Sequence, residues 1–338
     1  MPDQNGPSVS IVIPVYGRGD LLLRCLESIF QTCGVGDAEI VVVDDASPDP
    51  ATRAILDELA RDQRLRVVRQ TVNGGFATAC NRGFELATGE LVVLLNSDTE
   101  VQAGWMQPLV ESFSEGDVAV AGGLLVYPGT SQVIQHAGIG FHGTGEGIRA
   151  FHYGQFWRLA QAPWARERRY LPAVTGACLA VRRKAIEDPT LLDVRFRNGY
   201  EDVDLCLRLG EAGWKIRYCG DSLVVHLESV SSIRFASERE NARLFRSRWK
   251  GLGGRYGSDS SAWEAKDRKA RRAYLLDPSP WNAAAVAKLA GRTGNEDEIR
   301  QWRELSRGSL LPWKRISAER RKRLHGILGF DDLEIRSC

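Results

Sequence analysis

The sequence of 338 residues has no apolar run long enough to cross a membrane. Its longest uninterrupted apolar runs, such as 11–15 and 91–95, fall far short of the ~18 residues that indicate a membrane span. The first residues also lack the basic stretch followed by an apolar stretch that marks a secretory signal peptide. These absences lead us to expect a cytoplasmic protein.

Cysteine usage and composition exclude further classes. The seven cysteines are scattered, and no two are spaced as Cys-x-x-Cys, which argues against a disulfide framework and against a zinc ribbon. With 43% hydrophobic and 26% charged residues, 34 glycines and 13 prolines, the chain has none of the bias of disordered or collagen-like sequences. A folded chain of this length is expected to form about two domains.

Two glycine-rich phosphate-binding motifs are missing as well. The segment 17–22 lacks the third glycine of the dinucleotide-binding fingerprint, and Pro14 stands where its tight turn would begin. The Gly-x-x-x-x-Gly-Lys-Ser/Thr motif of P-loop enzymes occurs nowhere. The sequence therefore argues against a Rossmann-type oxidoreductase and against a P-loop enzyme.

The sequence does contain an alternation of apolar, strand-like segments and amphipathic, helix-like segments. Strands are predicted at 8–15, 38–43, 65–69 and 90–95. The helices between them are predicted after a cap at Asp20, at 51–62 and at 76–87. This alternation is typical of an α/β fold with a mainly parallel sheet. Ligands bind beyond the carboxyl ends of such strands, where three polar clusters occur, at 14–16, 44–45 and 96–98.

The chain beyond residue 126 is less regular. Strands are predicted near 174–181, 215–219 and 222–226, and a helix is predicted to start at Glu201. Residues 136–156 are rich in glycine and contain three histidines. We predict that this segment is a mobile loop that orders over the site when ligands bind.

Charge divides the chain unevenly. Residues 236–338 carry 23 Lys and Arg against 14 Asp and Glu, a net charge of +9, and residues 1–235 carry 22 against 29, a net charge of −7. We predict an α/β domain at 1–235 and a helical, basic, tryptophan-rich region at 236–338. That region could be a packing domain or could contact an anionic membrane surface. No motif supports nucleic-acid binding.

Five short segments stand out together: 9–16 (VSIVIPVY), 42–47 (VVDDAS), 73–83 (NGGFATACNRG), 95–98 (LNSD) and 199–205 (GYEDVDL). In this order they resemble family 2 glycosyltransferases of the nucleotide-sugar-binding GT-A fold, over residues 8–235. With 224–229 (VVHLES) the pattern looks most like the rhamnosyltransferase-type branch. The resemblance implies a GT-A domain with a mainly parallel central sheet, followed here by a mostly helical C-terminal extension.

The resemblance implies how a nucleotide-sugar donor is held. Asp45 would hydrogen-bond a uracil or thymine ring, and Pro14 and Tyr16 would complete the base pocket. Further donor contacts are implied for Asn81, Asn96, Thr175 and Gly176. Structural alternatives remain open, because paired acids can cap a turn and a glycine can simply relieve packing.

The resemblance also implies a Mg²⁺ or Mn²⁺ cofactor. Asp98 resembles the final acid of the Asp-x-Asp metal motif, and His226 resembles the second metal-binding residue of the family. A carboxylate and an imidazole are suitable ligands for a divalent ion. Asn96 departs from the motif, since many members have Asp there, and could contact the sugar or the ribose instead. Both predicted ligands could also be ordinary structural residues at strand ends.

Glu201 and Asp202 form an acidic pair at a predicted helix start. Helix N-termini favour acidic residues, so capping is the structural alternative. By resemblance, Asp202 removes the proton of the acceptor hydroxyl, and Glu201 holds the acceptor or orients this base. A single base opposite the diphosphate implies direct displacement with inversion at the anomeric carbon.

The resemblance implies an inverting, metal-dependent glycosyltransferase. It would move a sugar from a UDP- or dTDP-sugar to a hydroxyl of a glycan or lipid-linked saccharide during surface polysaccharide assembly. The alternative is a catalytically inactive module that binds nucleotide sugars or glycans on the same fold. Through its basic C-terminal region the protein could lie peripherally on the inner face of the membrane, and no nucleic-acid partner is expected.

Overall fold

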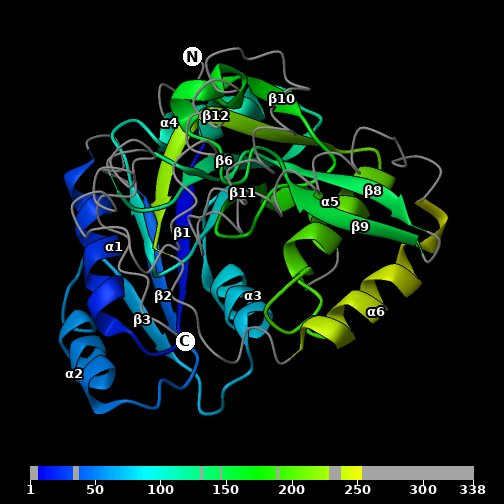
Figure 1. Cartoon of the computed structure of the whole chain (residues 1–338). Helices are drawn as coiled ribbons and strands as arrows, with labels where there is room; N and C mark the ends of the chain where they lie inside the picture. The colour runs from blue at the N-terminus through cyan, green and yellow to red at the C-terminus, as the bar shows by residue number, and fades with distance from the viewer. Residues whose placement is uncertain are drawn as a thin grey trace, which may run out of the picture.

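The computed structural model describes residues 7–32, 38–129, 132–144, 147–187, 190–227 and 237–252. Its N-terminal part is the predicted alternation of strands and helices (Figure 1). The strands are β1 (Val9–Val15), β2 (Glu39–Asp44), β3 (Arg66–Arg69) and β4 (Leu91–Leu95). The helices are α1 (Gly19–Gln31), α2 (Pro50–Leu59) and α3 (Phe76–Leu86).

The later part of the chain extends the same sheet. It adds β5 (Thr99–Val101), β6 (Val118–Val126), β7 (Ile134–His136), β10 (Arg168–Tyr170), β11 (Cys178–Arg182) and β12 (Lys215–His226). The main strand order is β10-β12-β6-β11-β4-β1-β2-β3, with β5 paired to β12 and β7 paired to β6. Along this path β10 and β11 run against the other strands, so the sheet is mainly parallel, as predicted.

Helices cover both faces of the sheet, which explains why its central strands are apolar throughout. Successive side chains of a strand point to opposite faces. In β1, Val12 joins the core cluster beneath α3 and α5 (Glu201–Glu211), whereas Ile11 and Ile13 join the cluster beneath α1, α2 and α4 (Met106–Glu111). Apart from α6 (Glu238–Arg248), the other helical segments among the described residues are single 3₁₀ turns: η1 (Ser112–Ser114), η2 (Leu159–Gln161), η3 (Pro163–Arg166), η4 (Arg183–Ala185) and η5 (Lys250–Leu252).

Strands occupy most of the described residues of the segment 136–156, so the prediction of a loop there is wrong. β7 pairs with β6, and β8 (Ile139–Thr144) pairs with β9 (Gly147–His152) as an antiparallel hairpin. The apolar residues between the glycines, such as Phe141 and Ile148, are buried in the core. A Cβ on Gly140 would lie within 2.7 Å of ring atoms of Phe151 and Tyr153. This glycine therefore makes room for aromatic rings and does not interrupt the strand.

Two smaller predictions also need correction. Asp20 does not cap α1: it lies inside the helix, and its carboxylate pairs with the Arg18 guanidinium at 2.8 Å. The residue before the helix is Arg18, whose backbone is in the left-handed conformation with φ of 53°. The two strands predicted at 215–219 and 222–226 form the single strand β12. Its register against β6 shifts between Cys219 and Leu223, which is why the sequence suggests a break.

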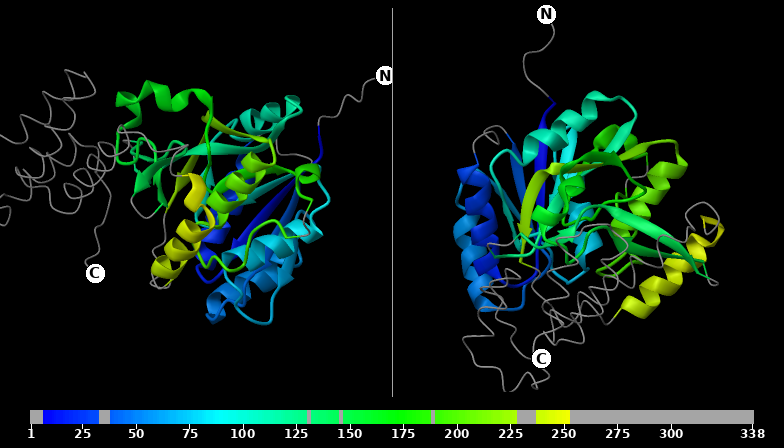
Figure 2. Two further views of the ribbon diagram at one scale, coloured as in Figure 1. Left: turned by 90° about the vertical axis from the view of Figure 1, so that its right-hand side faces the viewer. Right: turned by 45° about the horizontal axis from the view of Figure 1, so that its top comes forward.

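Helix α6 (Glu238–Arg248) belongs to the α/β body. It lies on the same side of the sheet as α3 and α5 (Figure 1), at the outer surface of that layer (Figure 2). Phe245 and Trp249 are part of the core cluster on this side. The body therefore extends past the predicted boundary at residue 235, at least to Leu252. The rest of the predicted helical region, residues 253–338, lies outside the described residues. Of the helices described, none is long and apolar enough to span a membrane.

Candidate active site

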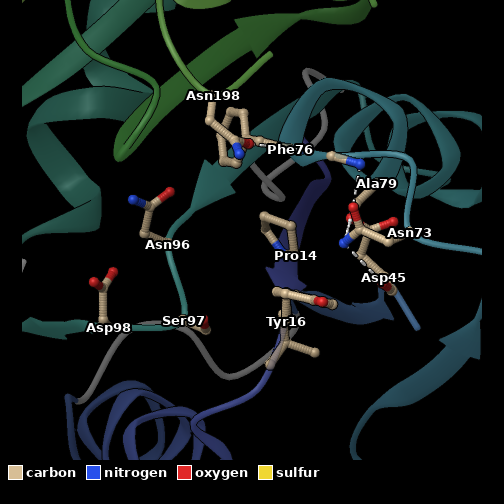
Figure 3. Close-up of a pocket in the computed structure, with 12 residues that line it drawn as sticks. Pro14, Tyr16, Asp45, Asn73, Phe76, Ala79, Asn96, Ser97, Asp98 and Asn198 are labelled. Carbon is tan, nitrogen blue, oxygen red and sulfur yellow. Dashed lines mark hydrogen bonds between the residues drawn. The ribbon is translucent and has the colours of Figure 1, made fainter. Parts of the chain in front are cut away.

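The polar clusters predicted at the strand ends meet at one edge of the sheet. There β1, β2 and β4 end beside the first turns of α3 and α5, and their residues line two adjoining hollows of about 190 and 200 Å³. The first hollow, shown in Figure 3, is lined by Pro14, Tyr16, Asp45 and Asn73, among others. The second is lined by Thr175, Gly176, Glu201, Asp202 and His226, among others. The residues common to both are Phe76, Asn96, Asp98 and Asn198.

Asp45 is held on the wall of the first hollow by the loop before α3. Its Oδ1 accepts from the Gly74 N–H at 2.7 Å. Its Oδ2 accepts from the Gly75 N–H at 2.8 Å and from Asn73 Nδ2 at 2.9 Å (Figure 3). Burial raises the pKa of Asp45, and the two backbone bonds act in the opposite direction. Each carboxylate oxygen has two lone pairs, so Oδ1 can accept one more hydrogen bond.

The two acids of the Asp44-Asp45 pair have different surroundings. Asp44 Oδ1 accepts from the Ser47 N–H at 2.8 Å and closes the turn after β2. Asp45 lies in the hollow that Pro14 and Tyr16 also line, and Tyr16 is 42% exposed there. The capped-turn interpretation therefore applies to the first acid, and the second faces a space that can take a ligand.

Asp98 and His226 are brought together by strand pairing across 128 residues of sequence. β5 follows Asp98 and pairs antiparallel with the end of β12, so that Thr99 lies opposite His226. The His226 Nε2 atom lies 3.1 Å from Asp98 Oδ1 and 3.3 Å from Asn96 Nδ2. Its other ring nitrogen, Nδ1, lies 2.6 Å from Gln135 Oε1.

This donor set fits a small divalent cation. Neighbouring ligands of an octahedral ion held at about 2.1 Å stand about 3 Å apart, and Asp98 Oδ1 and His226 Nε2 are 3.1 Å apart. The same site contains a buried polar atom, Asn96 Oδ1, for which the described residues provide no hydrogen-bond partner. They also provide no cluster of three or more His, Cys, Asp or Glu residues suited to a metal. The remaining ligands would have to come from a bound molecule or from water.

Asp202 faces the second hollow from the first turn of α5. Its Oδ2 accepts from the Gly176 N–H at 2.7 Å, and its Oδ1 accepts from the Val203 N–H at 2.8 Å. Burial raises the pKa of Asp202, and bonds from these two amides and from the Thr175 hydroxyl offset part of the rise. A carboxylate whose pKa lies above its ordinary value is a better proton acceptor.

The loop that leads into α5 has a rarely adopted backbone conformation. Asn198, Gly199 and Tyr200 have φ angles of 54°, 154° and 76°. In a residue with a side chain such angles cost energy, and they concentrate at functional sites. Glu201 Oε2 accepts from the Gly199 N–H at 2.6 Å, and Asn198 Oδ1 accepts from the Phe76 N–H at 3.2 Å. Glu201 therefore stabilises the helix start, and Asn198 ties the loop to α3.

Three predicted donor contacts have distinct positions. Asn81 lies outside both hollows, and its amide bonds twice to the backbone of Leu192, at 2.8 Å in each case. The amide of Asn81 thus anchors the backbone at Leu192, and its donor contact stays a prediction. Thr175 and Gly176 do line the second hollow. A Cβ on Gly176 would lie 3.2 Å from Asp202 Cβ, so this glycine permits the close approach of Asp202.

Several site residues are not identified by the sequence reasoning. Asn73 and Phe76 lie in the quoted segment 73–83, but the role of Asn73 in holding Asp45 emerges only from the folded loop. Asn198 and Gln135 carry no motif. For Asn198 the one signal is its position before Gly199, since asparagine and glycine are the residues that tolerate positive φ.

The chain is similar in sequence to several known proteins. Residues 10–188 match the family model described as Glycosyl transferase family 2. The chain is 32% identical over 240 residues to the O-antigen biosynthesis protein RfbC of Myxococcus xanthus, covering 68% of this chain and 18% of that protein. It is 29% identical over 227 residues to the pre-mycofactocin glycosyltransferase of Mycobacterium tuberculosis, covering 66% of this chain and 44% of that protein. This chain thus spans less than half the length of each of these relatives.

A solved structure shows the same fold. GalNAc-T7, crystallised with UDP, GalNAc and Mn²⁺, superposes with a TM-score of 0.57 at 20% sequence identity, covering 80% of this chain and 52% of the other. The family-model match ends at residue 188, before α5 and the end of β12. The assignment of Asp202 and His226 to the candidate site therefore rests on the geometry described above and not on the family-model match.

Proposed function

The chain belongs to glycosyl transferase family 2, and from this premise we propose that it transfers a sugar from a UDP- or dTDP-sugar to an acceptor hydroxyl with inversion. The observation that carries the proposal is the arrangement of three groups around two adjoining hollows. Asp45 lines one hollow, Asp202 lines the other, and Asp98, which contacts His226, lines both. This is the order in which a base, a diphosphate and a reacting sugar would lie in one extended donor.

The first hollow binds the nucleoside. The free lone pair of Asp45 Oδ1 accepts the imide N–H of uracil or thymine, which are the pyrimidines that carry such a donor. Pro14 and the half-exposed ring of Tyr16 pack against the base. Asn73 and the two glycine amides hold the Asp45 carboxylate in place, so that little side-chain freedom is lost on binding.

Asp98 and His226 would hold Mg²⁺ or Mn²⁺ beside the donor diphosphate. Bound there, the ion would supply positive charge against the negative charge that develops on the leaving diphosphate. Asn96 lies against His226, and its buried amide oxygen, which has no hydrogen-bond partner among the described residues, is available to accept a hydrogen bond from a sugar or ribose hydroxyl. Support for a metal of this kind comes from GalNAc-T7, a protein of the same fold that was crystallised with UDP and Mn²⁺.

The second hollow holds the reacting hydroxyl. Asp202 takes the proton of the acceptor hydroxyl as its oxygen bonds to the anomeric carbon. The bond between that carbon and the diphosphate oxygen breaks, and the nucleoside diphosphate leaves with the bonding electron pair. One displacement opposite the leaving group inverts the anomeric centre. Glu201, bound to the Gly199 amide, keeps the first turn of α5 in register so that Asp202 faces the hollow.

The acceptor is a glycan or a lipid-linked saccharide of a surface polysaccharide. The support for this class is the name of the M. xanthus relative, an O-antigen biosynthesis protein. The net charge of +9 on residues 236–338 would attract an anionic membrane surface on its cytoplasmic side, where lipid-linked acceptors are presented.

The test compares the wild-type chain with Asp202→Asn on a panel of UDP- and dTDP-sugars with Mn²⁺. We expect the wild type to release nucleoside diphosphate and the variant to be slower by roughly 10²–10⁴-fold, because an amide cannot accept the proton. Calorimetry should show UDP or dTDP binding to both. Glu211→Gln, at the other end of α5, is the matched control. A wild type that binds the donor but never turns it over would indicate a binding module and contradict the proposal.

A further inference from the structure

Strand β7 carries two buried polar side chains that the proposed reaction does not use. Gln135 is 6% exposed and His136 is fully buried. Consecutive residues of a strand point to opposite sides, and here each one reaches a different half of the candidate active site. β7 is anchored on β6, with Leu125 opposite His136 and Val126 opposite Ile134.

Gln135 determines where the proton of the His226 ring lies. Its Oε1 is 2.6 Å from His226 Nδ1, and an amide oxygen can only accept a hydrogen bond. Asp98 Oδ1, which also only accepts, competes for the ring hydrogen from 3.1 Å at Nε2, and the shorter contact of 2.6 Å places the hydrogen on Nδ1. In the neutral ring this leaves a lone pair on Nε2 that faces the lone pairs of Asp98 Oδ1, and a cation between the two atoms makes this contact favourable. The contact of 3.3 Å between Asn96 Nδ2 and His226 Nε2 agrees with a hydrogen on Nδ1, because the amide group then donates to the lone pair of Nε2.

His136 supports the opposite half of the site in a similar way. Its Nε2 accepts from the Thr175 N–H at 3.4 Å, and its Nδ1 lies 2.9 Å from His152 Nδ1. Thr175 in turn precedes Gly176, whose amide holds Asp202. One short strand thus contacts the residues behind both the proposed metal ligand and the proposed base.

We infer that Gln135 is a positioning residue, which holds His226 as the Nδ1–H tautomer so that Nε2 and Asp98 are presented together to the metal. This inference rests on the proposed function, because it assumes that His226 is a metal ligand. Partners of this type orient the imidazole, and their removal typically lowers metal affinity by roughly 10–100-fold. A hydrogen bond to the distal ring nitrogen is the means by which proteins select a histidine tautomer.

The experiment uses the full chain, three variants that test the inference and a fourth that assigns the His226 signal. Gln135→Leu removes the acceptor at similar size, Gln135→Glu keeps an acceptor, and Gln102→Leu is the matched control, since Gln102 bonds to the Glu100 carbonyl and not to the site. Long-range ¹H–¹⁵N spectra of the metal-free protein report the tautomer of His226, whose signal is assigned by its loss in His226→Asn. Electron paramagnetic resonance titrations with Mn²⁺ and UDP report metal affinity without turnover.

We expect the Nδ1–H tautomer in the wild type, in Gln135→Glu and in Gln102→Leu. In Gln135→Leu we expect a shift toward Nε2–H and a fall in Mn²⁺ affinity of roughly 10–100-fold. If Gln135→Leu keeps both the tautomer and the wild-type Mn²⁺ affinity, the inference is overturned and the proposed function stands. If the wild type binds no Mn²⁺ with UDP present, the metal ligands of the proposed function fail, and the inference fails with them.

Discussion

Two acidic pairs, Asp44-Asp45 and Glu201-Asp202, divide structural and chemical roles in the same way. In each pair the first acid bonds to a backbone amide of its own turn, Ser47 for Asp44 and Gly199 for Glu201. The second acid lines a hollow and is bound by amides from another part of the chain. Burial raises the pKa of both second acids. The local bonds of the first acid thus hold the turn that aims the second.

Removal of either proposed metal ligand should raise the metal concentration required for turnover. Asp98→Ala and His226→Ala each remove one of two side chains that lie 3.1 Å apart, and we expect Mn²⁺ affinity to fall in both when measured by calorimetry with UDP present. The double variant should lose less than the sum of the two, because the groups act as one unit. Asp117→Ala, which removes a surface ion pair with Lys215, is the control. Unchanged Mn²⁺ affinity in one variant would remove that residue from the metal site.

The raised pKa of Asp202 predicts the acidic limb of the pH profile. Asp202 accepts a proton only when it is ionised, so kcat should fall as the pH drops through its pKa. Because burial raises that pKa, the limb should lie above ~4, the ordinary value for aspartate. Asp45 also has a raised pKa, but its protonation should weaken donor binding and appear in KM. A kcat that stays constant down to pH 4 would contradict the assignment of Asp202 as the base.

At the scale of elements, α6 acts as a clamp on α5 and on the loop before it. The Asn241 amide bonds to both backbone groups of Arg197, at 3.1 and 2.7 Å. Buried Asp204 on α5 accepts from Arg248 at 2.7 Å and from the Trp249 indole at 3.0 Å. These contacts stabilise the loop 198–200, whose positive φ angles would otherwise relax.

Asn241→Ala should therefore affect catalysis as well as stability. It leaves the N–H and the carbonyl of Arg197 without partners, which costs about 1–3 kcal/mol for each group that stays buried. We expect a lower unfolding midpoint in urea and a lower kcat, with UDP affinity unchanged, because the clamp acts on the base side of the site. Ser247→Ala, on the exposed face of α6, is the control. Lower stability with an unchanged kcat would reduce α6 to a packing element.

At the scale of the whole molecule, the α/β body should include the residues up to Leu252 and not end at residue 235. A chain of residues 1–252 keeps Phe245 and Trp249, which are 1% and 9% exposed, and should unfold cooperatively and bind UDP. A chain of residues 1–235 loses both, and loss of each buried aromatic side chain costs about 3–5 kcal/mol. Denaturant unfolding of the two chains is the comparison. Equal stability would restore the boundary predicted from the change in charge.

The sequence by itself determined the α/β alternation and the edge of the sheet where the polar residues of the candidate site gather. Runs such as 91–95 are apolar at every position because both faces of β4 are covered, and this pattern is visible without coordinates. The polar residues that directly follow such strands, including Asp45 and Asp98, could be identified for the same reason. The hairpin at 139–152 was missed, because glycine ordinarily breaks strands and the aromatic rings that require Gly140 are identified only by packing.

Only the tertiary structure decided which side chains act together. Asp98 meets His226 because β5 pairs with β12, and Asp202 meets Gly176 because α5 packs beside the start of β11; neither pairing follows from spacing along the chain. The partner of Asn81 is also visible only in the tertiary structure: the resemblance implies a donor contact, and in the fold the amide bonds to the backbone of Leu192. The same is true of Gln135, which has no motif. Burial patterns follow from local hydrophobicity, whereas the partners of a polar side chain depend on long-range register, which single residues do not encode.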